Sequence, residues 1–114
     1  MSECIFCRIA AGQLETDILF QDDRVCVFRD IVPKAPIHLL IIPNAHIASI
    51  DQVEPGHAEI LSHMLLTAQK MSRDCQVDQS GYRLVFNTHD EGGQTVPHLH
   101  LHLLAGRQMT WPPG

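Results

Sequence analysis

The stretch from Val96 to Ala105 reads V-P-H-L-H-L-H-L-L-A, and histidine alternates with leucine over six consecutive residues. A period of two is typical of a β-strand, on which successive side chains point to opposite faces. We therefore expect a strand over 96–105, with His98, His100 and His102 on one face and leucines on the other. The leucines would anchor the strand in a core, and the histidines would line a surface or a cleft.

Weaker patterns predict the other elements. Apolar residues at helical spacing predict a short helix over 4–11 and one long helix that begins near Pro55 and runs to about Met71. Segments 17–20, 24–30, 38–42 and 82–87 have the composition of strands, and the third is apolar enough to lie at the centre of a sheet. Together they predict an α+β fold with about five mostly antiparallel strands, one long helix and a short N-terminal helix.

Length and composition narrow the class of protein. A chain of 114 residues is expected to form one domain, 1–114, with residues 105–114 as a C-terminal tail. The net charge is −5 and no run of Lys or Arg occurs, so we expect neither nucleic acid nor a membrane surface as partner. The first residues lack the features of a secretory signal, and we expect a reducing, cytoplasmic compartment in which the cysteines are thiols or metal ligands.

Three histidines on one strand face allow two kinds of chemistry. A single zinc site shared by all three is disfavoured, because His98 and His102 would lie about 13 Å apart along a strand. The central His100 is instead well placed for nucleophilic catalysis, with a neighbour on each side to hold its tautomer and handle protons. The third reading, a solvated face without a task, fits less well because such faces usually draw on Lys, Glu, Thr and Gln. The preceding G-G-Q-T offers backbone and hydroxyl donors to an anion.

Cys4 and Cys7 form a C-x-x-C pair near the N-terminus. This spacing is half of a zinc site, and two histidines would have to complete it. Two incidental buried thiols remain an alternative, and a redox pair is disfavoured because no strand precedes it.

Several segments together resemble one family. H-L-H-L-H-L-L resembles the signature of the histidine triad (HIT) family. G-G-Q-T-V-P-H-L-H-L-H-L-L-A-G-R-Q-M-T-W-P-P-G is similar to the C-terminal third of its Hint branch, the purine nucleoside phosphoramidases, and F-R-D-I-V-P-K-A-P-I-H-L-L-I-I-P-N-A-H-I resembles an earlier segment of that branch. The resemblance implies a HIT-like fold and a homodimer. It also implies a hydrolase that cleaves the P–N bond of purine nucleoside 5′-phosphoramidates through a nucleotidyl-histidine intermediate, with no cofactor required for catalysis.

The resemblance also implies roles for individual residues. His100 would be the nucleophile, flanked by His98 and by His102, which would contact the phosphate, while His38 would orient a ring behind them. Thr95 stands where the branch usually has Ser. The phosphate would be bound by Asn87, Gly93, Gln94 and Thr95. The ribose would contact Asp30, which lies beside Ile31. The base pocket would comprise Ile5, Phe6, Ile9, Phe28 and Leu40.

Two further roles follow from the same resemblance. Trp111, in the tail, would reach the partner's site and shape leaving-group specificity. Some relatives with the N-terminal cysteine pair complete a structural zinc site with residues that correspond here to His46 and His98. A zinc ligand at His98 would conflict with acid–base work by that residue.

Purely structural roles are alternatives for several of these residues. Without the resemblance, Asp30 is also typical of a turn cap, Asn87 of a strand end, and His38 of a satisfied core histidine. The apolar residues would be ordinary core. At the level of function, the alternatives are a nucleotide-binding regulatory or scaffold module with incidental slow hydrolysis and a protein whose purpose is zinc binding. Dinucleoside polyphosphate hydrolysis is disfavoured by the Hint-like tail.

Overall fold

The structure, a computed structural model, describes residues 3–114. Five strands occur in this part of the chain: β1 (Ile18–Gln21), β2 (Val25–Arg29), β3 (Ile37–Pro43), β4 (Tyr82–Phe86) and β5 (Leu101–Ala105). The helices are α1 (Ile5–Ala10), α2 (Ala58–Asp74) and α3 (His89–Gly92), with short 3₁₀ turns η1 (Ile50–Gln52) and η2 (Pro55–His57).

The strands form one sheet in the order β1-β2-β3-β5-β4, and every neighbouring pair is antiparallel. The predicted α+β fold with one long and one short N-terminal helix is therefore confirmed. The central position expected for the apolar segment 38–42 is also confirmed, because β3 pairs on both sides and is buried along nearly its whole length.

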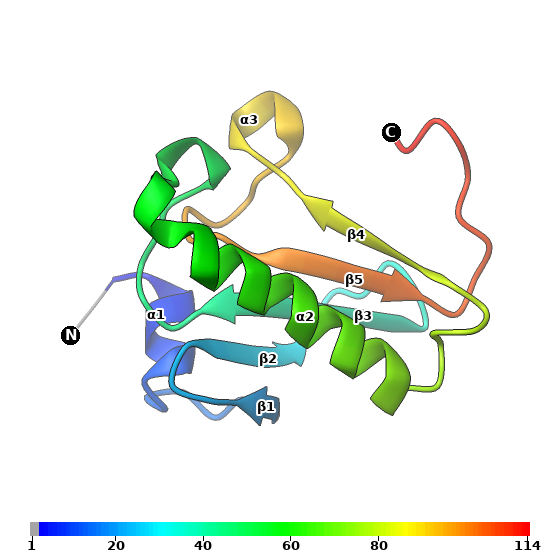
Figure 1. Cartoon of the computed structure of the whole chain (residues 1–114), viewed down its shortest axis with the longest axis horizontal. Coiled ribbons are helices and arrows are strands. Elements are labelled where there is room, and N and C mark those ends of the chain that lie inside the picture. The colour runs from blue at the N-terminus through cyan, green and yellow to red at the C-terminus, as the bar shows by residue number, and fades with distance from the viewer. Residues whose placement is uncertain (1–2) are drawn as a thin grey trace.

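The two faces of the sheet are covered differently. Figure 1 shows α2 lying across one face, where Met64 and Ala68 pack against a core that includes Leu101 and Leu103. On the other face, Phe6 and Ile9 of α1 pack against buried side chains of β2 and β3, namely Cys26, Phe28, Leu40 and Ile42. The β5–β4 half of this second face carries no helix and lines a cavity instead.

The histidine stretch departs from the expected strand. Only Leu101–Ala105 belongs to β5, and residues 96–100 form an irregular crossing segment. Pro97 has no N–H to give to a ladder, and the Leu99 N–H donates to the Ile47 carbonyl (2.6 Å) rather than to a neighbouring strand. The expected alternation nevertheless holds, since Leu99, Leu101 and Leu103 are all buried in the α2-side core.

Two smaller differences concern turns. The D-E-G-G segment (90–93), whose residues are typical of a turn, forms the end of the one-turn helix α3, which closes at Gly93 in the left-handed region (φ 81°). The Pro55 turn is a separate 3₁₀ turn, and α2 itself begins at Ala58. The tail after β5 has no regular structure, as expected. In residues 3–114 no helix is long and apolar enough to cross a membrane.

Candidate active site

The strand register brings two histidines together on the open face of the sheet. In β3 and β5, Leu40 lies opposite His102, and His38 lies opposite Leu104. The two imidazoles are therefore diagonal neighbours on one face, a relation that long side chains can bridge. Their Nε2 (His38) and Nδ1 (His102) atoms lie 2.9 Å apart.

Hydrogen bonding determines which nitrogen of each ring carries the proton. The backbone N–H of Lys34 donates to His38 Nδ1 (3.0 Å), so neutral His38 must carry its proton on Nε2 and donate it to His102 Nδ1. His102 then carries its own proton on Nε2. That atom is buried and has no hydrogen-bond partner among residues 3–114. The relay therefore ends in a buried N–H donor on a ring that lines two cavities.

The neighbouring His100 is held in the opposite tautomer. Its Nδ1 lies 2.7 Å from the carbonyl oxygen of His98, an acceptor only, so Nδ1 carries the proton and donates it. The Nε2 lone pair is then available to attack an electrophile. The ring is packed edge-to-face against Phe6 (centroids 5.2 Å apart) and lies 4.9 Å from the ring of His102. A lone pair and an N–H donor thus stand side by side.

Burial keeps the relay neutral. Desolvation, with the nearby His100 and His38, lowers the pKa of His102 to about 4, although Asp30 opposes the shift. Burial also lowers the pKa of His38, again against the effect of Asp30. Both rings are therefore uncharged at neutral pH, which the tautomer assignment requires.

An apolar cavity of about 450 Å³ lies beside these rings. It is lined by His100, His102, Thr95 and Asp30, and by all five residues expected for the base pocket: Ile5, Phe6, Ile9, Phe28 and Leu40. Ile31 lies at its rim and is 94% exposed. The structure therefore brings the expected base and ribose residues together in one cavity that reaches the His100 ring.

A second cavity, of about 570 Å³, continues from the first, because Asp30, Thr95 and His102 line both. Asn87 and Gly93, expected at the phosphate end, line this second cavity, as does His38. It also contains three cations that sequence reasoning missed, namely Lys34, Arg83 and Arg107. The signal available in the sequence was weak, since these residues are scattered along the chain and only the fold collects them.

Asp30 caps a turn and also lies at the wall of the site. Its Oδ1 accepts the backbone N–H of Val32 (2.9 Å), which caps the turn after β2. Its Oδ2 lies 3.5 Å from His38 Nε2 and at the wall shared by both cavities. One carboxylate therefore fixes the loop and presents an acceptor to the site.

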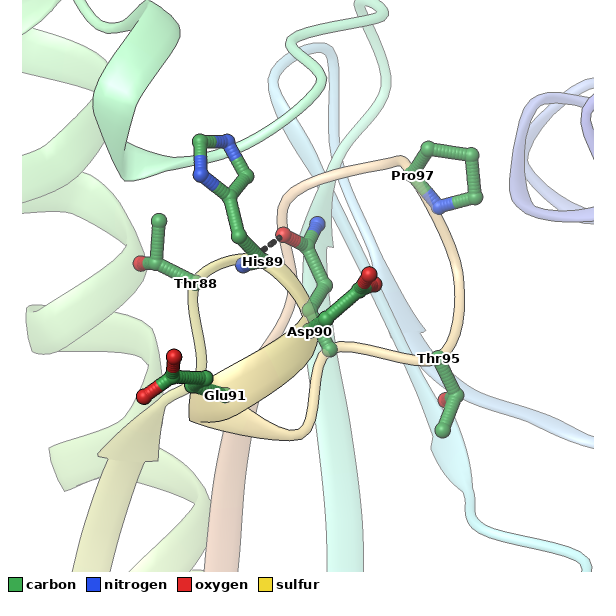
Figure 2. A pocket seen from close by; sticks show the side chains of 7 residues that line it. Thr88, His89, Asp90, Glu91, Thr95 and Pro97 are labelled. Atoms are coloured by element: carbon green, nitrogen blue, oxygen red, sulfur yellow. Dashed lines mark hydrogen bonds between the residues drawn. The ribbon is translucent and has the colours of Figure 1, made fainter.

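Gln94 and Trp111 line neither of these two cavities, and the role expected for Trp111 at a partner's site stays a prediction. The Gln94 side chain accepts the His89 N–H and donates to the carbonyls of Ala48 and Val96, so it braces the loop rather than lining either cavity. Figure 2 shows the hollow on that side, which is lined by Thr95, Pro97 and residues of the one-turn helix α3. Its volume is about 720 Å³. Trp111 is 84% exposed and lines none of the three cavities.

His98 belongs to a different cluster. It is fully buried and lines none of these three cavities, and its Nε2 lies 2.9 Å from the Pro43 carbonyl, which assigns the proton to Nε2. Its Nδ1 lone pair lies 3.3 Å from Cys4 Sγ and 3.4 Å from Cys7 Sγ, and His46 Nδ1 lies 3.3 Å from Cys7 Sγ. All four ligand atoms fall within 4.8 Å of one another. Tetrahedral zinc places N and S ligands about 3.6 Å apart, so this donor set fits zinc.

A second group, Asp30, His38 and His102, has metal-ligand atoms at similar separations. It does not fit a metal, because the Lys34 N–H occupies His38 Nδ1 and forces a proton onto the Nε2 atom that would have to ligate. The group is a hydrogen-bond relay.

Comparison with known proteins agrees with this arrangement. Residues 3–111 match the family described as scavenger mRNA decapping enzyme C-terminal binding. The chain is 44% identical to the purine nucleoside phosphoramidase of Escherichia coli, over 94% of this chain and 90% of the relative. The crystal structure of a HIT family hydrolase from Legionella pneumophila superposes with a TM-score of 0.96 at 51% identity, covering 98% of this chain and all of the other. A histidine triad protein from Clostridium difficile superposes with a TM-score of 0.93 at 37% identity, covering 96% of each chain. The imidazoles of this site are held in defined tautomers by hydrogen bonds, and both the sequence and the fold are similar to those of these relatives. The chain belongs to the histidine triad family.

Proposed function

We propose that this protein hydrolyses the P–N bond of purine nucleoside 5′-phosphoramidates through a nucleotidyl-His100 intermediate. One observation carries the proposal. The His100 ring, with a lone pair on Nε2, lies beside the His102 ring, with a proton on Nε2, and both rings line an apolar cavity with the dimensions of a ligand site. The similarity to a purine nucleoside phosphoramidase supports the substrate class.

In the first step, the purine enters the apolar cavity and the ribose hydroxyls meet Asp30. His100 Nε2 attacks phosphorus, the N–P bond to the ring forms, and the bond from phosphorus to the leaving amine breaks. His102 Nε2–H donates to a phosphoryl oxygen as negative charge develops there. The modified His100 ring becomes cationic, and the His98 carbonyl that accepts its Nδ1–H stabilises that charge.

The departing amine needs a proton. Thr95 is exposed and lines both cavities, so its hydroxyl can give a proton to the amine while it takes one from solvent. Water then attacks phosphorus, the P–N bond to His100 breaks, and nucleoside monophosphate leaves. His98 takes no part in proton transfer in this scheme, because its Nδ1 faces the cysteines.

We further propose that Cys4, Cys7, His46 and His98 hold a structural zinc ion. Zinc would supply stability rather than chemistry, because it would tie the first turn of α1 to the segment that carries His100. Cys4 is the N-cap of α1, and Phe6 on that helix contacts both the His98 and His100 rings. The ion would therefore fix the wall against which the nucleophile is packed.

The dimer and the compartment are also proposals. β4 is an edge strand, and Leu65 and Leu66 on α2 are 46% and 60% exposed. A second copy that pairs along β4 would extend the sheet and cover exposed apolar surface. Thiol ligands such as those proposed at Cys4 and Cys7 favour a reducing compartment such as the cytoplasm.

The test is hydrolysis of an AMP–amine conjugate by wild type and by His100→Gln, with folding of both checked by circular dichroism. We expect the substitution to reduce kcat by at least about 10³-fold, because removal of a nucleophile abolishes the covalent route. Wild-type turnover that survives in His100→Gln would refute the assignment. Tight AMP binding without turnover by wild type would instead identify a nucleotide-binding module.

A further inference from the structure

The cavity beyond His102 gathers positive charge on an acidic chain. Lys34, Arg83 and Arg107 line it, three of only eight Lys and Arg residues in a protein of net charge −5. Lys34 lies in the loop before β3, Arg83 on β4, and Arg107 just after β5. Three separate elements therefore place cations around one hollow.

No carboxylate among residues 3–114 forms an ion pair with these cations. Arg83 Nη2 donates to the Thr110 carbonyl (2.9 Å), and Arg107 Nε donates to the Lys34 carbonyl (3.0 Å). These bonds to neutral oxygens hold the guanidinium groups in place and leave further N–H donors on each. Within the described part of the chain, Asp30 is the one carboxylate that lines the cavity, and its Oδ1 already accepts the Val32 N–H.

The cavity lies on the side of the site where a leaving group must go. His100 lines the apolar cavity and not this one, whereas His102, one strand step further on the same face, lines both. Displacement in line requires the leaving amine to depart opposite the attacking His100 Nε2. Across β5, His102 pairs with Val85 and Leu104 pairs with Arg83, so Arg83 lies one diagonal step beyond His102 on β4.

The geometry points to an anion-binding leaving-group subsite: Lys34, Arg83 and Arg107 select amines that carry a carboxylate or similar negative group. This inference rests on the proposed phosphoramidase function and specifies the substrate class within it. An anionic group in a cavity with three cations gains attraction that an uncharged amine of equal size does not. Arginine suits the task because its planar fork binds a carboxylate with two hydrogen bonds.

The experiment compares two conjugates of equal size, AMP joined through its phosphorus to the α-amino group of alanine or of alaninamide. The measured quantity is the ratio of kcat/KM for the carboxylate over the amide, in wild type, Arg83→Gln and Arg73→Gln. Arg73 is an exposed cation in the last turn of α2, on the opposite face of the sheet, and is the matched control. We expect the ratio to fall roughly tenfold in Arg83→Gln and to stay at its wild-type value in Arg73→Gln. Raising the salt concentration should lower the wild-type ratio and leave that of Arg83→Gln nearly unchanged.

An unchanged ratio in Arg83→Gln would overturn the inference. An unchanged ratio that accompanies an equal loss for both conjugates would mean that the cations serve the phosphate rather than the leaving group. If wild type hydrolyses neither conjugate, the proposed function fails, and equilibrium binding of both conjugates to the same three proteins carries the test of the subsite. Preferential binding of the carboxylate that Arg83→Gln loses would support the subsite, and equal binding would refute it.

Discussion

Acid should destabilise this protein through the same ring that ends the relay. His102 is held neutral in the folded protein, with its pKa lowered to about 4 by burial and by its histidine neighbours. In the unfolded chain a histidine has a pKa near 6.5. The unfolded state therefore binds more protons than the folded state between these two values, and the free energy of unfolding falls as the pH is lowered through this window.

The size of the effect follows from the two pKa values. At pH 7 the folded and unfolded forms of His102 are both mostly neutral, and the term is small. At pH 5 the unfolded imidazole is almost fully protonated while the folded one is mostly neutral, so His102 alone costs about 2 kcal/mol of unfolding free energy relative to pH 7. Below about pH 4 both forms are protonated and the dependence levels off. His38, whose pKa is also lowered by burial, adds in the same direction.

The assay is urea denaturation of wild type, His102→Gln and His89→Asn at pH 7 and pH 5. Gln retains an acceptor for the His38 Nε2–H and cannot titrate. The control removes an exposed imidazole on α3, and Asn tolerates the positive φ (59°) of that position. We expect wild type and His89→Asn to lose about 2 kcal/mol more than His102→Gln on acidification. Equal losses in all three proteins would refute a buried, neutral His102 and with it the proton assignment of the relay.

Three other perturbations test the packing and the metal proposal. Phe6 packs between α1 and the sheet, so Phe6→Ala should lower the unfolding free energy by about 3–5 kcal/mol in urea denaturation. The control, Ile5→Ala, removes a side chain that is 48% exposed and should cost far less. Similar losses in the two variants would contradict the packing. Gly106→Ala should lower the unfolding free energy by about 1–3 kcal/mol, because φ is 93° and the new Cβ would lie 2.9 Å from Pro36 Cβ. In the control, Gly56→Ala, the new Cβ meets no atom within 4 Å, so the unfolding free energy should hardly change in the same assay. Cys7→Ser should abolish the zinc content of the purified protein, measured by elemental analysis, and lower its Tm. The control, Cys75→Ser, should keep the wild-type zinc content and Tm. Wild type that binds no added zinc would rule out the structural metal.

Local patterns predicted the sheet well because each strand carried its own signal. The alternation correctly placed the leucines in the α2-side core, opposite the cavity that His100 and His102 line. The continuous apolar segment at 38–42 correctly predicted the central strand. The extent of the histidine strand was wrong, because a period of two persists in an extended segment that pairs with no neighbour. The decisive contact there, from the Leu99 N–H to the Ile47 carbonyl, joins parts of the chain that are far apart in sequence.

The sequence indicates which residues form the site better than it indicates which contacts each of them makes. His98, His100 and His102 look equivalent in the sequence, but the fold turns His98 toward the cysteines and leaves the other two at the cavity. The Gln94 side chain hydrogen-bonds to backbone groups of His89 and Ala48, so these bonds hold the loop in place. The half-buried His63 has its Nε2 2.6 Å from Asp22 Oδ2, although the two residues are far apart in sequence. Such pairings depend on tertiary contacts that no local spacing encodes.

The most direct measurement of the central claim is the mass of the protein quenched in acid-free denaturant during turnover of an AMP–amine conjugate. We predict a species heavier by one adenylyl group, with the modification mapped by peptide sequencing to His100 and absent from His100→Gln. An adduct on His98 or His102, or steady turnover by a wild-type protein that never carries the group, would contradict this claim.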